Sequence, residues 1–149
     1  MKIAVAGDHA GLSLKKLILE KLKQDGHQVV DLGAFDEAPS DYPDFARAIG
    51  RSVSSGKAEK GILICGSGIG ACVAANKVKG IRAGVAHDIY SAHQGVEHDN
   101  MNILCLGARV IGPAPALEIA TSFVSARFTN EERHVKRLKK VMAIEERGE

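Results

Sequence analysis

The sequence predicts an α/β protein in which a parallel five-stranded sheet is covered by helices on both faces. First, short apolar runs alternate along the chain with segments whose apolar residues recur at helical spacing. Second, glycines and polar residues follow these runs, for example at Gly7-Asp8-His9 and at Gly107-Ala108-Arg109. Open parallel sheets bind ligands beyond the carboxyl ends of their strands. We therefore expect the functional residues to gather at that edge of the sheet.

The order of the elements follows from the same alternation. The first helix ends before Gly26, a residue suited to a left-handed stop, and Pro113 and Pro115 fall early in a later helix, where a missing N–H costs little. Strands are expected at residues 2–7, 28–32, 61–65, 81–86 and 102–107. Helices are expected at residues 11–25, 43–55, 68–78, 89–98, 113–126 and 131–146.

Composition limits the class of protein. The 149 residues, 45% hydrophobic and 26% charged, suit one domain spanning residues 1–149. The sequence has no apolar window of about 18 residues and no secretory signal, so we expect no membrane span and a cytoplasmic location. Cys65, Cys72 and Cys105 form an odd set without a CxxC pair, which argues against a disulfide framework.

Several ligand classes are also disfavoured. A formal net charge of +2, with two Tyr, four Phe and no Trp, offers little for nucleic-acid binding. No HExxH motif, CxxC pair or carboxylate cluster is present, so we predict no metal. The absence of a GxxxxGKS/T loop argues against nucleotide hydrolysis.

The stretch "CGSGIGA", residues 65–71, joins an expected strand to an expected helix. Successive backbone N–H groups from Gly66 to Gly70 can point into one concavity and hold a phosphate, a carboxylate or a developing oxyanion. A thiolate at Cys65 would be stabilised there and could act as a base or nucleophile. Taken alone, Cys65 is more simply explained as the last buried residue of the strand.

The same loop also fits a dinucleotide fingerprint. Gly66, Gly68 and Ala71 satisfy G-x-G-x-x-A, and Asp88 lies where a ribose-binding carboxylate would be expected. That fingerprint usually opens the first βα unit of a longer enzyme, whereas here it lies in mid-chain. A dinucleotide-binding module is therefore the weaker alternative.

Further candidates lie outside the loop. Asp8 can cap a helix or bind sugar hydroxyls, His9 can transfer protons, and Tyr42 can close a pocket or merely pack. His98 and Asp99 end an expected helix in "EHDNMN". Arginines suited to a phosphate are Arg109, beyond the fifth strand, and the pair Arg133 and Arg137, four apart on one helical face; such charge runs are most often solvated.

Several separated motifs together resemble one family. They are "MKIAVAGDHAG", "DYPDFA", "GILICGSGIGACVAANKVKGIRAG", "YSA", "EHDNMNILCLGARVIG" and "ERHVKR", in order along nearly the whole chain. The chain is similar to the ribose-5-phosphate isomerase B family, which includes allose-6-phosphate and galactose-6-phosphate isomerases. The resemblance implies a Rossmann-like three-layer fold and cofactor-independent aldose–ketose isomerisation in the pentose phosphate pathway. It also implies a homodimer with shared active sites, sometimes paired into a tetramer, with the helix at residues 131–146 at the dimer interface.

The resemblance also assigns roles by matching position. Cys65 is expected to move the proton between C1 and C2, and Ser67, where the family usually has threonine, to assist at the sugar oxygens. The amides of Gly66, Ser67, Gly68, Ile69 and Gly70 would hold the enediolate. His98 resembles the ring-opening histidine. The residues expected around the sugar and its phosphate are Asp8, His9, Tyr42, Arg109, Arg133 and Arg137.

One departure bears on the substrate. The family more often has asparagine where this chain has Asp99, and a carboxylate accepts but does not donate hydrogen bonds. Ribose 5-phosphate remains the expected substrate because the arginine pair suits a five-carbon phosphate. The alternatives are allose 6-phosphate, galactose 6-phosphate, a four-carbon sugar phosphate or a free aldose.

Overall fold

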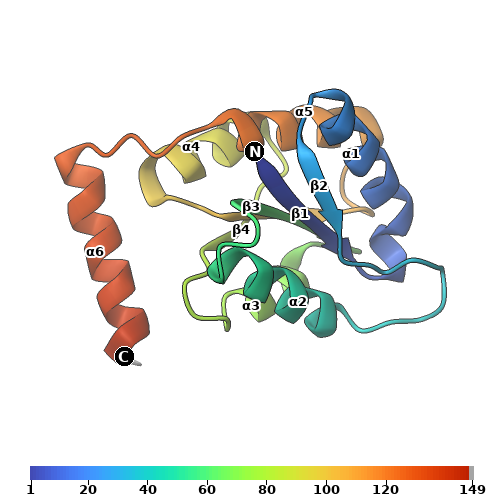
Figure 1. Ribbon diagram of the computed structural model, residues 1–149, viewed down its shortest axis with the longest axis horizontal. Coiled ribbons are helices and arrows are strands. Elements are labelled where there is room, and N and C mark those ends of the chain that lie inside the picture. Colours follow the sequence, from blue (N-terminus) through green and yellow to red (C-terminus); the bar gives the residue numbers. More distant parts are fainter. Residues whose placement is uncertain (148–149) are drawn as a thin grey trace.

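The computed structural model describes residues 1–147 and confirms the α/β/α architecture with one all-parallel sheet (Figure 1). The strand order is β2-β1-β3-β5-β4, so β3 lies in the centre between β1 and β5. Buried residues form β1, β3 and β5, as expected of a parallel sheet covered on both faces, whereas the edge strands β2 and β4 are partly exposed. The strands are β1 (Lys2–Gly7), β2 (Gln28–Asp31), β3 (Lys60–Cys65), β4 (Ala83–Val85) and β5 (Ile103–Gly107).

Helices cover both faces of the sheet. Figure 1 places α1, α4 and α5 on one face and α2 and α3 on the other, while α6 stands apart at one end. A short 3-10 turn, η1 (His9–Gly11), precedes α1 because Asp8 Oδ1 accepts a hydrogen bond from the Gly11 amide at 3.1 Å. The helices are α1 (Leu12–Gln24), α2 (Tyr42–Ser54), α3 (Ile69–Ala75), α4 (Ile89–Asp99), α5 (Pro113–Ser125) and α6 (Glu132–Arg147).

Two expected elements are shorter than the sequence predicted. The helix expected at 68–78 spans only Ile69–Ala75, and the strand expected at 81–86 spans only Ala83–Val85. The side chain of Asn76 makes two hydrogen bonds with the backbone of Ala83. Asn76 Nδ2 donates to the Ala83 carbonyl at 2.9 Å, and the Ala83 amide donates to Asn76 Oδ1 at 2.8 Å. This pairing ends the helix and joins it to the start of β4.

The sheet divides the core into two clusters. Ile62, Ile64, Leu104 and Leu106 face α1, α4 and α5, whereas Leu63, Cys65, Ile103 and Cys105 face α2 and α3. Alternate residues of a strand point to opposite faces, so the two sets interleave along β3 and β5. Cys65 is thus the last buried residue of the α2–α3 face, beside the loop that opens α3.

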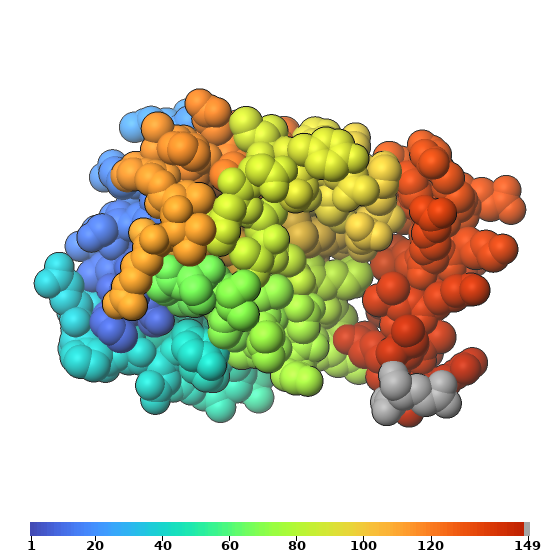
Figure 2. All heavy atoms as spheres, turned by 180° about the vertical axis from the view of Figure 1, so that it is seen from behind, coloured from blue at the N-terminus to red at the C-terminus, as the bar shows by residue number. Residues whose placement is uncertain are grey.

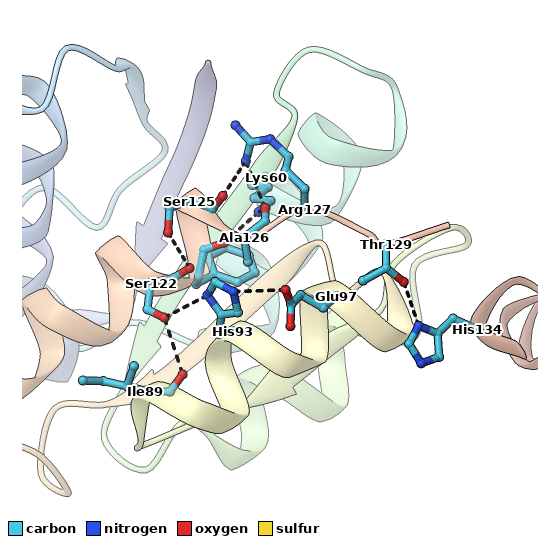
Figure 3. Close-up of polar contacts among 11 residues, drawn as sticks. Lys60, Ile89, His93, Glu97, Ser122, Ser125, Ala126, Arg127, Thr129 and His134 are labelled. Atoms are coloured by element: carbon cyan, nitrogen blue, oxygen red, sulfur yellow. Dashed lines mark hydrogen bonds and ion pairs between the residues drawn. The ribbon is translucent and has the colours of Figure 1, made fainter. Parts of the chain in front are cut away.

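A buried lysine anchors the segment between α5 and α6. Lys60, at the start of β3, is 8% exposed, and its Nζ donates to the carbonyls of Phe123 at 2.7 Å, Ala126 at 2.8 Å and Val124 at 3.3 Å. These carbonyls lie where a helix end leaves acceptors without intrahelical partners. Burial, and secondarily the charge of Arg127, lowers the pKa of Lys60 to about 8. The contact between Lys60 and Ala126 fixes the start of the C-terminal arm, which comprises residues 127–147 (Figure 3).

The C-terminal arm, residues 127–147, leaves the body of the molecule. Figure 2 shows α6 beside the body, with a hollow between them. The hollow is a pocket of about 460 Å³ lined partly by Ile81, Leu138, Val141 and Ile144. Within residues 1–147, no helix is long and apolar enough to cross a membrane.

Candidate active site

The site is built on Cys65, where β3 ends, and on the loop that follows it. The Gly68 amide donates to Cys65 Sγ at 3.1 Å, and the Ile69 amide donates to Ser67 Oγ at 3.2 Å. An N–H aimed at sulfur stabilises negative charge on a thiolate. Gly68 caps α3 instead of lying within it as the sequence predicted, because its φ is +82°, a left-handed value that favours glycine.

Close backbone packing explains the neighbouring glycines. A Cβ on Gly68 would lie 3.0 Å from the carbonyl carbon of Leu106, and one on Gly107 would lie 2.6 Å from the Ser67 carbonyl oxygen. The Ala108 amide also donates to the Cys65 carbonyl at 2.8 Å. The loop is therefore pressed against the end of β5, and this contact holds the thiol and the loop amides in place.

A pocket of about 330 Å³ opens over the thiol. Asp8, 7% exposed, and Arg109 lie on its wall, and the Arg109 amide donates to the Gly66 carbonyl at 3.0 Å. Asp8 both caps η1 and lines the pocket, so the two interpretations of this residue are compatible. The lining residues are Asp8, Tyr42, Cys65, Gly66, Ser67, Gly70, Arg109 and Val110. This set can hold an anion beside a thiol base.

His9 follows Asp8 but is not among the lining residues, and it is held by the loop between β2 and α2. Ser40 donates its amide to His9 Nδ1 at 3.1 Å, and the His9 amide donates to Ser40 Oγ at 3.1 Å. Because Nδ1 accepts, the neutral ring carries its proton on Nε2. The first strand and the loop are tied together where the Gly7 amide donates to the Gly33 carbonyl at 2.7 Å.

Two further side chains support this edge of the sheet, and sequence reasoning gave neither of them a role. Lys15 is 1% exposed, and its Nζ donates to Asp31 Oδ1 at 2.5 Å and to the Ala34 carbonyl at 2.6 Å. His87 Nε2 accepts the Gly107 amide at 2.9 Å. The position of His87 after the fourth expected strand pointed to this edge. A lysine in an amphipathic helix gave no such indication.

The remaining expected site residues lie elsewhere in the chain. Helix α4 begins at the carboxyl edge of the sheet and runs back for 11 residues, roughly 16 Å, before β5 starts. His98 and Asp99 end α4, and Arg133 and Arg137 belong to α6, so none of the four lines the pocket over Cys65. Within one chain the expected residues therefore form two groups. The thiol cluster lines the pocket around Cys65, and the arm cluster comprises His98, Asp99, Arg133 and Arg137.

The arm cluster is organised around two stacked imidazoles. The rings of His98 and His134 lie 4.0 Å apart between centroids, with 29° between their planes. His134 is fully buried, and its Nδ1 shares a hydrogen bond of 2.7 Å with Thr129 Oγ1 (Figure 3). Burial, with a smaller effect of His98, lowers the pKa of His134, which favours the neutral form of that ring. Arg133 Nε donates to Glu131 at 2.8 Å on the surface.

The other two cysteines lie away from the pocket. The sequence predicts core positions for both thiols. Cys105 is fully buried in β5, but Cys72 is only half-buried and donates to the Ala83 carbonyl at 3.4 Å. Hydrogen bonding with Cys105 lowers the pKa of Cys72 to about 7 and raises that of Cys105.

Other ligands find less support in the geometry. Among residues 1–147, no three His, Cys, Asp or Glu side chains are grouped closely enough to hold a metal ion. Asp88, the residue required by the dinucleotide alternative, caps α4 by accepting the Ser91 amide at 2.7 Å. Hydrogen bonds from the backbone and the side chain of Ser91 lower the pKa of Asp88. Its position is therefore explained without a ribose.

Comparison with known proteins agrees with the fold. The family model for Ribose/Galactose Isomerase matches residues 3–141. The structure of ribose-5-phosphate isomerase B from Clostridium thermocellum is 42% identical and covers 100% of both chains with a TM-score of 0.97. That from Mycoplasma genitalium, with bound ribulose-5-phosphate, is 41% identical and covers 97% of this chain and 96% of that one, with a TM-score of 0.91.

A further relative differs in substrate. D-erythrulose-4-phosphate isomerase of Pectobacterium atrosepticum is 42% identical over 130 residues, which cover 86% of this chain and 85% of that one. The similar proteins thus include isomerases named for five-carbon, four-carbon and six-carbon sugar phosphates. What they share is the reaction, in which an aldose and a ketose interconvert. The chain belongs to the ribose/galactose isomerase family and is a sugar-phosphate aldose–ketose isomerase.

Proposed function

We propose that the enzyme interconverts ribose 5-phosphate and ribulose 5-phosphate through an enediolate, a step of the pentose phosphate pathway. The observation that carries the proposal is the position of the Cys65 thiol. Its Sγ accepts a hydrogen bond from the Gly68 amide at 3.1 Å, and it lines a pocket together with Arg109. The bound ribulose-5-phosphate of the Mycoplasma genitalium relative supports a five-carbon substrate.

In this mechanism the Cys65 thiolate removes the proton at C2 of the open-chain aldose and returns it to C1. Negative charge develops on the oxygens of C1 and C2, where the N–H groups between Gly66 and Gly70 stabilise it. Ser67 exchanges a proton with those oxygens, and Asp8 and Tyr42 contact the sugar hydroxyls. No metal or cofactor takes part in these steps.

We further propose that the arm cluster completes the pocket of a second copy of the chain. The support is geometric, because His98, Arg133 and Arg137 lie away from the thiol of their own chain. In the homodimer, α6 packs at the interface, His98 opens the sugar ring, and the arginines, with Arg109 and His9, bind the phosphate. Asp99 then faces the sugar. The three free thiols suit a reducing cytoplasm.

Solvent exchange tests the role of Cys65. In deuterated water the enzyme is expected to place deuterium at C2 of ribose 5-phosphate, and Cys65→Ala should abolish this exchange. Cys72→Ala is the matched control, since it removes a half-buried thiol from the neighbouring helix. Full exchange in Cys65→Ala would show that another group is the base.

Mixing variants tests the shared site. Cys65→Ala and His98→Ala are each inactive as homodimers, but a mixed dimer has one pocket with both native residues. Random mixing makes half of the dimers mixed, so about one quarter of the wild-type activity should return, provided the residues act as one unit. No recovery of activity after subunit exchange would contradict the shared site. It would mean either that Cys65 and His98 act in a pocket of the same chain or that one of them does not belong to the pocket.

A four-carbon sugar phosphate is the second candidate substrate, favoured by the similarity to the D-erythrulose-4-phosphate isomerase. A panel of kcat/KM values decides between them, using ribose 5-phosphate, erythrose 4-phosphate, allose 6-phosphate, galactose 6-phosphate and free ribose. A clear preference for ribose 5-phosphate supports the main proposal. A preference for any other sugar would overturn it while leaving the reaction type intact.

A further inference from the structure

Gln94 lies one helical turn before His98 on α4 and contacts its ring. Gln94 Nε2 and His98 Nδ1 are 2.9 Å apart, and both side chains are half-buried. A side-chain amide nitrogen only donates hydrogen bonds, so Nδ1 accepts. The neutral imidazole of His98 therefore carries its proton on Nε2.

The face of the same ring is held from the arm. His134 stacks on it at 4.0 Å, and Thr129, which fixes His134, donates its amide to the Glu97 carbonyl at 3.1 Å. Burial lowers the pKa of His134 and so favours its neutral form, which can support the His98 ring without repelling a proton on it. The orientation and the tautomer of His98 are thus fixed by separate contacts, the ring face by His134 and the tautomer by Gln94.

We propose that Gln94 is a positioning residue for ring opening, which keeps the proton of His98 on Nε2. This inference rests on the proposed function, in which His98 opens the furanose. In that step the C1–O4 bond breaks and its electron pair goes to O4, which takes the Nε2 proton. The C1 hydroxyl becomes the carbonyl and releases its proton to water, and water reprotonates Nε2.

The requirement for Gln94 depends on the substrate. Ribose 5-phosphate closes a five-membered ring through its free C4 hydroxyl and must be opened before C2 can lose its proton. Erythrose 4-phosphate carries its phosphate on the C4 oxygen, so it cannot close that ring. A residue that serves only ring opening should therefore matter for the five-carbon substrate and not for the four-carbon one.

Gln94→Glu tests this prediction with almost no change in shape. A carboxylate only accepts hydrogen bonds, so it draws the proton of the neutral ring to Nδ1 and leaves Nε2 bare. The assay is run at about pH 9, well above the range in which free imidazole side chains are protonated. The charged groups near the two rings, Glu131, Arg133 and Arg137, remain unchanged. Gln24→Glu, an exposed change on α1, is the matched control.

The expected result is a split between substrates. In Gln94→Glu, kcat for ribose 5-phosphate should fall at least about tenfold, within the range for loss of general-acid catalysis, while KM stays near its wild-type value. Turnover of erythrose 4-phosphate should remain as in the wild type. Nitrogen-15 spectra should show the His98 proton on Nε2 in the wild type and in Gln24→Glu, and on Nδ1 in Gln94→Glu.

The outcomes separate this inference from the proposed function. Equal losses on both substrates, no loss on ribose 5-phosphate, or a wild-type proton on Nδ1 would overturn the role of Gln94. A wild-type enzyme that turns over only the four-carbon substrate would overturn the proposed function. The nitrogen-15 spectra would then still decide whether Gln94 sets the tautomer of His98.

Discussion

Tyr42 packs its ring against the bare Cα of Gly70, so closely that a Cβ on Gly70 would lie 2.7 Å from Tyr42 Cζ. Both residues line the pocket over Cys65. Gly70→Ala should therefore displace the Tyr42 ring and raise KM for the sugar phosphate about twofold to tenfold, the loss of roughly one hydrogen bond.

Gly112→Ala is the control for that measurement. Gly112 precedes α5 with an ordinary φ of −76°, and a Cβ there meets nothing within 4 Å. Steady-state kinetics should leave this variant at the wild-type KM. An unchanged KM in Gly70→Ala would mean that Tyr42 does not contact the sugar.

Gly68→Ala should remove activity beyond its effect on stability. The left-handed φ of Gly68 and the contact with Leu106 would force the loop to shift and would weaken the hydrogen bond to Cys65. A lost hydrogen bond to a charged group corresponds to about 1.5–3 kcal/mol, or roughly a tenfold to hundredfold loss in kcat.

Gly80 offers a matched control for this backbone strain. Its φ is +83°, almost that of Gly68 at +82°, but the nearest atom to a Cβ there is Ser54 Cβ at 3.8 Å. Gly80→Ala should lower the free energy of unfolding by about 1 kcal/mol and leave kcat unchanged. Equal kcat losses in the two variants would attribute the effect of Gly68→Ala to strain alone.

The Lys15–Asp31 pair predicts an asymmetry in stability. Asp31→Ala leaves the cation of Lys15 buried without its carboxylate and should lower the free energy of unfolding by about 2–4 kcal/mol. Lys15→Met removes the buried charge and leaves Asp31, whose side chain is 33% exposed, to water, so its cost should be nearer about 1–2 kcal/mol. Urea denaturation measures both, and the reverse order would contradict the assignment of Lys15 as the desolvated partner.

Lys60 predicts a rise in stability with pH. Its pKa falls from 10.5 to about 8 on folding, so between these values the unfolded chain binds a proton that the folded chain has lost. The free energy of unfolding therefore increases as pH rises through this window. The advantage of the wild type over Lys60→Met should grow between pH 8 and pH 10 in urea denaturation. Lys57→Met, which alters an exposed lysine, should leave the slope unchanged.

The sequence predicted the sheet, its helices and the edge that carries the thiol cluster, because apolar periodicity and strand-end glycines follow directly from burial on both faces. It left β4 and α3 too long, because the pairing of Asn76 with Ala83 depends on residues seven apart meeting through a side chain. The divided site also escaped residue-level reasoning. Which end of the sheet His98 occupies depends on the direction of α4, and a list of site residues does not contain that direction.

The buried supports show a further limit of pattern-based prediction. Lys15 and Lys60 resemble ordinary surface lysines in the sequence. Each is nevertheless buried and donates to the backbone, Lys15 to the Ala34 carbonyl and Lys60 to the Phe123 carbonyl. Their partners lie 19 and 63 residues away along the chain. Only the assembled fold brings such groups together.

The C-terminal arm, anchored through Lys60 and carried away from the thiol of its own chain, also bears on how such an enzyme can diverge. Under the proposed assembly, a substitution near Cys65 and one on α6 are inherited together but act in different pockets. After gene duplication, one copy can lose its thiol and the other its arm residues, and the mixed pair still retains one complete pocket. The geometry of the arm thus permits a division of labour between two genes that a self-contained site would forbid.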